Sequence, residues 1–204
     1  MPDILTSLRG KKIGLSQNGR LLVDPVGRGA GAAGILLYAN TAASGALSNY
    51  TAQRAFDTYA TIPANSLEPG SVIRIRYQGI QTAVNGTDTI QPILTIGASL
   101  GANNAVTGGT ALTTGTATAG GVSKIFHGEY ELVIRTIGSS GTMVGNGIFK
   151  AVPAAEATYA AVDDILASTT IDTTVDQLIT VGIAYSAASS SNSCRLDILR
   201  VIVH

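Results

Sequence analysis

The chain has 204 residues, enough for one domain with an ordinary hydrophobic core and an additional arm. Thirteen basic residues balance thirteen acidic ones, so the net charge gives no general attraction to nucleic acid or to an anionic membrane. Charged residues make up only 13% of the chain and mean hydropathy is +0.30, which favours a surface that packs against other subunits.

Targeting signals and cysteine content indicate the cellular compartment in which the chain folds. No apolar run approaches the roughly eighteen residues of a membrane-spanning helix, and residues 30–39 come nearest. The cationic N-terminus is not followed by an apolar core, so we expect no secretory signal. Cys194 is the only cysteine, which excludes an intrachain disulfide and fits folding in a reducing cytosol as a buried structural thiol.

Residues 1–24 predict a short β-hairpin arm. The runs 12–15 and 20–23 flank Asn18-Gly19, a dipeptide that adopts positive φ readily in a tight turn. An isolated hairpin is only marginally stable in water, so we expect the arm to pack against the rest of the chain or against a neighbouring protein. The candidate attachment residues are Arg9, Lys11, Lys12, Asn18, Gly19 and Arg20.

A glycine-rich connector follows at residues 25–34. Gly29, Gly31 and Gly34 spell GxGxxG, the pattern of a dinucleotide site. Such a site needs a helix that opens at the last glycine, and residues 35–38 lead instead into a loop without helical period. We therefore interpret the stretch as a connector rather than a cofactor site.

Residues 56–79 contain two alternating apolar runs separated by Pro63 and Pro69-Gly70, which force the chain to reverse. In the second run, Ile73, Ile75 and Tyr77 share one face and predict a core strand. Arg74 and Arg76 lie on the other face. A nucleic-acid surface would interleave such arginines with exposed aromatics, so pairing with Glu129, Glu131 or another subunit is favoured.

The middle of the chain predicts further strands. Pro92 indicates an edge strand or a bulge in residues 89–97, and residues 98–123 predict long loops with one or two short strands. Residues 128–137 alternate and turn at 138–141 into 142–152, which predicts a hairpin. The residues expected to point inward are Tyr130, Leu132 and Ile134, against Glu129, Glu131, Val133 and Arg135 outward.

The last quarter contains one ambiguous stretch and one clear pattern. Residues 153–168 are rich in alanine and would suit an amphipathic helix as well as a strand, so both interpretations stay open. Residues 177–186 alternate with Ile179, Val181, Ile183 and Tyr185 on one face. Together with 194–203 they predict a terminal hairpin.

Catalytic and metal-binding patterns are missing from the sequence. The adjacent carboxylates Asp163-Asp164 and the pair Asp172 and Asp176 lie in polar segments where such groups are usually solvated. His127 and His204 are the only histidines, too few for a three-histidine zinc site. We expect no catalytic residue, no metal and no cofactor.

Three segments carry a resemblance to a known family: residues 56–79, residues 134–151 (IRTIGSSGTMVGNGIFKA) and residues 174–203. They resemble the jelly-roll domains of bacteriophage virion proteins, among them trimeric capsid decoration proteins, head fibres and tail-associated receptor binders. The resemblance implies an all-β fold, a jelly-roll β-sandwich preceded by a short N-terminal β-hairpin arm. It divides the chain into an anchoring arm with its connector, 1–34, and a sandwich domain, 35–204.

The resemblance also implies a role. It points to a structural component of a virion, made in the host bacterial cytoplasm and attached as a homotrimer to the capsid exterior, as head decoration or head fibre. The implied partners are other copies of the chain and the major capsid protein or another virion subunit, with neither nucleic acid nor membrane. The candidate intersubunit polar face consists of Arg74, Arg76, Glu129 and Glu131.

The alternative role is a tail-associated receptor- or carbohydrate-binding jelly-roll module that takes a host surface glycan. Sugar sites stack rings on tryptophan or tyrosine, whereas this chain has no Trp and 5% aromatic residues. The composition therefore favours the structural role.

Overall fold

The computed structural model of the protein describes residues 13–15, 21–23, 35–83, 88–114, 118–119, 124–152 and 160–204. The chain divides into two compact units, Met1–Ile35 with His204, and Leu36–Val203. In the first unit, strands β1 (Ile13–Leu15) and β2 (Leu21–Val23) pair antiparallel, with Ile13 opposite Val23.

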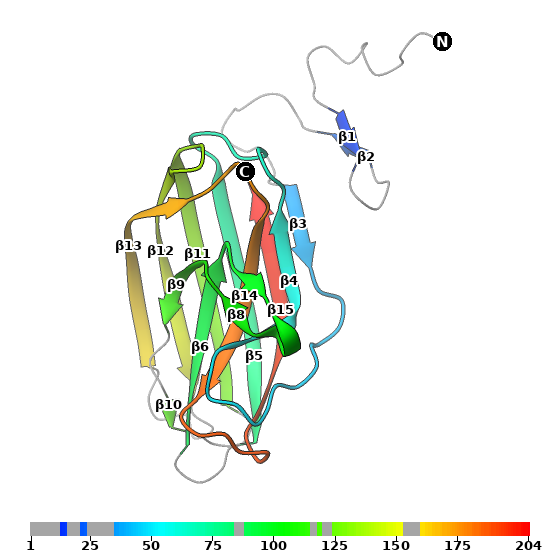
Figure 1. The fold of residues 1–204 in the computed structure, drawn as a ribbon, viewed down its shortest axis with the longest axis vertical. Coiled ribbons are helices and arrows are strands. Elements are labelled where there is room, and N and C mark those ends of the chain that lie inside the picture. Colours follow the sequence, from blue (N-terminus) through cyan, green and yellow to red (C-terminus); the bar gives the residue numbers. More distant parts are fainter. Residues whose placement is uncertain are drawn as a thin grey trace. The chain divides into compact units, whose positions relative to one another are not determined.

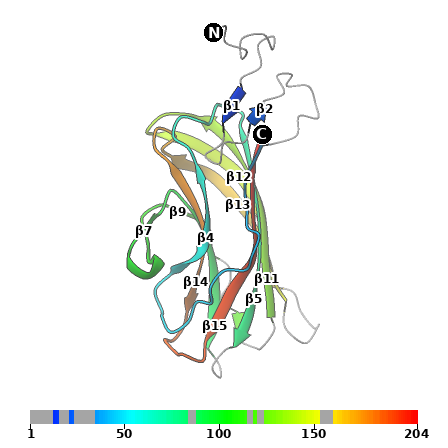
Figure 2. The ribbon, with the colours of Figure 1, turned by 90° about the vertical axis from the view of Figure 1, so that its right-hand side faces the viewer.

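The second unit is an all-β jelly-roll sandwich, as predicted, and its two sheets are seen edge-on in Figure 2. One sheet has six strands in the order β13 (Ala160–Ile171), β12 (Gly141–Val152), β11 (Lys124–Thr136), β5 (Val72–Ala83), β15 (Ser193–Val203) and β3 (Ile35–Ala39) (Figure 1). The other has five, in the order β10 (Thr118–Ala119), β6 (Thr89–Ile96), β14 (Gln177–Tyr185) and β4 (Arg54–Ile62), with β9 (Thr110–Thr114) also on β6.

A small excursion projects from the five-stranded sheet. It contains β7 (Ser99–Leu100), the 3-10 turn η2 (Ala102–Asn104) and β8 (Val106–Thr107), and Figure 2 shows β7 on the side away from the six-stranded sheet. Strands β6 and β14 are buried on nearly all positions of both faces. The described residues contain no α-helix, and therefore no helix long and apolar enough to cross a membrane.

Strands β4 and β5 form as the alternating pattern predicts, but they lie in different sheets. Phe56 and Ile62 of β4 and Ile73 of β5 are fully buried between the sheets. The proline-containing connection turns twice, through Asn65 at φ 57° and Gly70 at φ 90°, left-handed conformations that asparagine and glycine adopt more readily than other residues. The reversal therefore carries the chain across the sandwich.

The core of the six-stranded sheet alternates large aromatic rings with glycines. Tyr77 in β5 lies opposite Gly128 in β11, and Tyr130 in β11 lies opposite Gly147 in β12. A Cβ atom at either glycine would overlap the facing tyrosine ring. The two rings stack at 6.2 Å between centroids with 4° between their planes. Each glycine thus provides the room that its neighbour's ring occupies.

Three local expectations need correction or completion. The last two strands do not form a hairpin: β14 pairs with β4 and β6, whereas β15 pairs with β5 and β3, so the connection crosses between the sheets. Pro92 lies in β6, which is an interior strand rather than an edge strand. It occupies the position at which the neighbour of β6 on one side changes from β9 to β10. The ambiguous stretch is a strand from Ala160 onward, and residues 153–159 lie outside the described residues.

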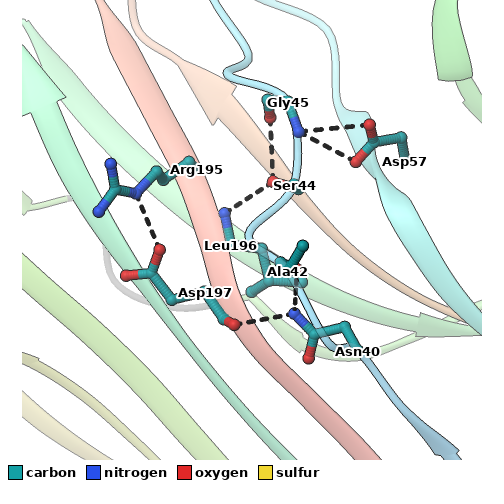
Figure 3. A network of polar contacts seen from close by, with 8 residues as sticks. All are labelled: Asn40, Ala42, Ser44, Gly45, Asp57, Arg195, Leu196 and Asp197. Atoms are coloured by element: carbon teal, nitrogen blue, oxygen red, sulfur yellow. Dashed lines mark hydrogen bonds and ion pairs between the residues drawn. The ribbon is translucent and has the colours of Figure 1, made fainter.

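The edge of β15 is closed by residues 40–47, which we call the edge strap (Figure 3). Ser44 donates its backbone N–H to the Leu196 carbonyl at 2.8 Å, and its Oγ accepts from Leu196 N at 2.9 Å. The backbone N–H of Gly45 donates to both carboxylate oxygens of Asp57 in β4 at 3.2 Å. The strap therefore links an edge of each sheet. The outer face of the six-stranded sheet is the open face, because every second described side chain of β5 and β15 is at least partly exposed, whereas β6 and β14 are buried on nearly all positions of both faces.

Candidate functional site

The outer face of the six-stranded sheet carries the four residues predicted as an intersubunit polar face. Arg74 and Arg76 alternate with the buried side chains of β5, and Glu129 and Glu131 alternate with those of β11. The register places Arg76 directly opposite Glu129 and Arg74 directly opposite Glu131. Strand alternation and register together bring all four side chains into one patch.

The four residues form two ion pairs within one chain. The Nε atom of Arg74 lies 2.7 Å from Glu131 Oε2, and Nε of Arg76 lies 3.1 Å from Glu129 Oε1. These side chains are about half exposed, and exposed pairs of this kind contribute roughly 0.2–1 kcal/mol each. The pairs thus order the face rather than stabilise the fold. Whether a second subunit covers the face stays a prediction.

Strands β15 and β12 extend the patch on both sides. Arg200 in β15 lies opposite Arg76, and Ile202 lies opposite Arg74. On the far side, Ile148 in β12 lies opposite Glu129, and Asn146 lies opposite Glu131. These residues line a groove of about 390 Å³, which we call the sheet groove.

His127 lies on the same face, one row from the groove. It is opposite Gln78 in β5 and Lys150 in β12. Partial burial and the nearby positive charge of Lys150 lower the pKa of His127, while Glu129 acts in the opposite direction. The imidazole is therefore neutral at pH 7, and the histidine adds no positive charge to the face.

A second pocket, of about 320 Å³, lies between the loop before β4 and the excursion of the five-stranded sheet. Arg54 crosses it, donating from Nη1 to the carbonyl oxygens of Ala102 at 3.2 Å and Asn103 at 2.9 Å. The guanidinium also lies 5.6 Å above the ring of Tyr50. Through these contacts Arg54 holds the excursion against β4.

The cysteine is placed as a structural residue. Cys194 is fully buried, and burial raises the pKa of its thiol to about 12. Burial likewise raises the pKa of the neighbouring Tyr185 hydroxyl, which donates to the Leu47 carbonyl at 2.8 Å. A thiol that stays protonated and inaccessible cannot act as a nucleophile.

The carboxylates singled out in the sequence have structural partners. Asp172 accepts from the backbone N–H of Thr174 at 2.9 Å and from its hydroxyl at 2.6 Å, and these hydrogen bonds lower the Asp172 pKa. Asp176 accepts from Ala64 N at 2.8 Å. The side chains of Asp163 and Asp164 lie outside the described part of the chain. Among the side chains that the structure describes, no three of His, Cys, Asp or Glu gather as metal ligands.

The candidate attachment arm is described only in its two strands. Arg9, Lys11, Lys12, Asn18, Gly19 and Arg20 all lie outside the described residues. The pairing of β1 with β2 is present, and the attachment role stays a prediction.

Sequence reasoning missed four residues of the sheet groove: Asn146, Ile148, Arg200 and Ile202. Alternation within residues 194–203 could have placed Arg200 on the outer face. Its position opposite Arg76 could not have been found, because a bulge between Leu196 and Ile198 sets the register from there on.

No family model matches the chain, and no curated protein sequence matches it. Among solved structures, a chain of the T13 particle of infectious bursal disease virus is similar, with a TM-score of 0.37 and 11% identity over 81% of this chain and 30% of that chain. A chain of the Gt strain of the same virus has a TM-score of 0.38 and 11% identity over 94% and 37%. This chain spans about a third of the length of those virus chains.

A plant lectin is similar to a comparable degree. Lectin I-B4 of Griffonia simplicifolia, in its metal-free form, has a TM-score of 0.33 and 9% identity over 95% of this chain and 87% of that chain. These likenesses are weak in both sequence and shape, and neither the fold described above nor the function proposed below depends on them.

Proposed function

We propose that this protein is a structural subunit of a bacteriophage virion. In the finer form of the proposal, it is a homotrimer attached to the outside of the capsid as a head decoration or head fibre, and it has no enzymatic activity. It would be made in the host bacterial cytoplasm, where its single, buried thiol needs no oxidising compartment.

The observation that carries the proposal is the open outer face of the six-stranded sheet. It combines paired charges with isoleucines that are about two-fifths exposed, Ile148 at 42% and Ile198 at 40%. Exposed apolar side chains among satisfied ion pairs are typical of a surface that another protein covers. The family resemblance supports the virion setting, because its segments supply β4, β5, β12, β14 and β15 of one sandwich.

The carbohydrate-binding alternative receives less support from the side chains. Tyr59 is the one aromatic ring among the described residues that is more than about a third exposed, at 43%. It lies on β4, away from the sheet groove. A sugar-binding face would need such a ring beside a pocket.

Purified particles test the proposal directly. Quantitative mass spectrometry of gradient-purified phage should find the protein in stoichiometric amounts, and immunogold labelling should decorate the head. Absence from purified particles would overturn the proposal. Labelling of the tail tip would favour the receptor-binding alternative instead.

A further inference from the structure

The sheet groove runs across the strands between two rows of outward side chains. Arg200, Arg76, Glu129 and Ile148 follow one another across four strands as one wall, and Ile202, Arg74, Glu131 and Asn146 form the other. Ile75, Tyr130 and Gly147 lie between the two rows and line the floor, and the side chains of Ile75 and Tyr130 are buried. Rows two residues apart along a strand are about 7 Å apart, which suits one extended chain.

The charges of the two walls do not cancel. Arg74 is paired with Glu131 and Arg76 with Glu129. Arg200 makes no ion pair with any carboxylate that the structure describes, and it lies directly opposite the like charge of Arg76. Like charges directly opposite on neighbouring strands are unfavourable unless an anion lies between them. The β15 end of the groove thus has one uncompensated positive charge.

We propose that the sheet groove binds an extended acidic segment of a second virion protein, with one carboxylate seated at Arg200 and Arg76. The inference rests on the proposed function and adds to it the chemistry of the partner. The carboxylate supplies the missing negative charge, and apolar side chains on either side of it contact Ile202 and Ile148 at the ends of the walls. Charge-assisted hydrogen bonds to arginine make such a contact specific for an acid over an amide.

The partner is a different protein rather than a second copy, because the aspartate and glutamate side chains that the structure describes are engaged in their own fold. Asp57 accepts a hydrogen bond from Gly45, Asp88 from Asn192, Asp172 from Thr174 and Asp176 from Ala64, while Asp197, Glu129 and Glu131 are paired with arginines. Seating one of them in a neighbour's groove would break a contact already made, whereas an acidic segment of the shell has no such cost.

Rebinding to particles tests the inference. Particles that lack this protein are mixed with full-length wild type, with Arg200→Gln, or with Arg135→Gln, and the bound amount is measured against protein concentration at low and high salt. Arg135 is a matched control, since it is an exposed arginine of β11 that does not line the groove. We expect Arg200→Gln to weaken binding about tenfold and to reduce its salt dependence, and Arg135→Gln to change it less than about twofold.

The outcomes bear differently on the two proposals. If wild type rebinds and Arg200→Gln rebinds equally well, the inference is wrong and the proposed function stands. If wild type does not bind particles, both are overturned. Light scattering of the same samples adds a third readout: a loss of oligomeric state in Arg200→Gln would show that the groove holds a second copy, and would overturn the assignment to a different protein.

Discussion

The side-chain amide of Asn40 occupies the place of a neighbouring strand beside Leu199. Its Oδ1 accepts from the Leu199 backbone N–H at 2.7 Å, and its own backbone N–H donates to the Leu199 carbonyl at 3.2 Å. Its Nδ2 donates at 2.8 Å to the carbonyl of Asp197, the extra residue of the β15 bulge (Figure 3). One residue thereby satisfies the backbone groups that the bulge leaves at the edge of the sheet.

Replacing Asn40 by alanine should therefore release the edge strap. We expect the free energy of unfolding, measured in urea, to fall by about 1–2 kcal/mol, because the Leu199 N–H and the carbonyls of Asp197 and Ala42 lose their side-chain partner. Hydrogen exchange of the Leu199 amide should accelerate more than that of Leu132 in the sheet interior. Thr41→Ala, at an exposed neighbouring position of the strap, is the control, and an equal loss of stability there would contradict the assignment.

Tyr130 and Gly147 lie opposite each other on neighbouring strands, and this arrangement gives a second prediction. A methyl group at Gly147 would overlap the Tyr130 ring, which is buried and stacks on the ring of Tyr77. Gly147→Ala should cost about 3 kcal/mol of unfolding free energy, as overpacked cores do. Gly101→Ala is the control, because its Cβ would come no closer than 3.7 Å to Ala105 O. Equal stability of the two variants would rule out the packing argument.

Alternation in the sequence predicted the inward faces well. Ile73, Ile75 and Tyr77 in β5 and Tyr130, Leu132 and Ile134 in β11 are all buried. Alternation is informative here because a strand with one solvent-exposed face alternates apolar and polar residues along the sequence. The pairing of Arg74 and Arg76 with Glu131 and Glu129 could be anticipated for the same reason, since all four lie on the wet face.

Pairing between strands was harder to predict. Strands β14 and β15 both alternate and are joined by a short loop, so they match the pattern of a hairpin equally well. Their assignment to opposite sheets depends on partners more than a hundred residues away, such as Thr61 opposite Leu178. The alanine-rich β13 is likewise decided by its pairing with β12, because its local helix propensity points the other way.

Gln81 provides a prediction of increased stability. Its side chain is fully buried in β5, and neither Oε1 nor Nε2 has a hydrogen-bond partner among the described residues. Gln81→Met keeps the length of the side chain and removes both polar atoms, so unfolding free energy should rise by about 1 kcal/mol. Gln78→Met on the outer face of the same strand should give no gain. A destabilised Gln81→Met protein would show that the amide has a partner in the folded protein.

The buried hydroxyls and thiol around Cys194 predict sensitivity to alkaline pH. Burial raises the pKa of Cys194 to about 12 and also raises those of Tyr50 and Tyr185. These groups ionise more readily in the unfolded chain. Stability is therefore complete below about pH 8.5, the ordinary thiol pKa, and falls as the pH rises toward 12. Cys194→Ala should flatten the first part of that decline, measured as unfolding free energy against pH.

The same burial predicts that the thiol is unreactive. At pH 8 the native protein should not react with a disulfide reagent over hours, while the protein in concentrated urea should react at one site per chain. Rapid labelling of the native protein would contradict the placement of Cys194 in the core.

The last prediction concerns the arm. Among the residues that the structure describes, the buried core lies between Tyr50 and Val201, and the partly buried side chains packed against it begin at Leu37, so the sandwich should fold without residues 1–34. The pairing of β1 with β2 involves three residues on each strand, far fewer than an isolated hairpin needs for stability, and it should gain most by docking on a partner. The truncated protein should remain soluble, rich in β-structure by circular dichroism and trimeric by light scattering, yet should no longer decorate particles. A mass of 20.7 kDa for the full-length protein would contradict the trimer. Wild-type occupancy of particles by the truncated protein would instead place attachment wholly in the sandwich, with the sheet groove as the first surface to test.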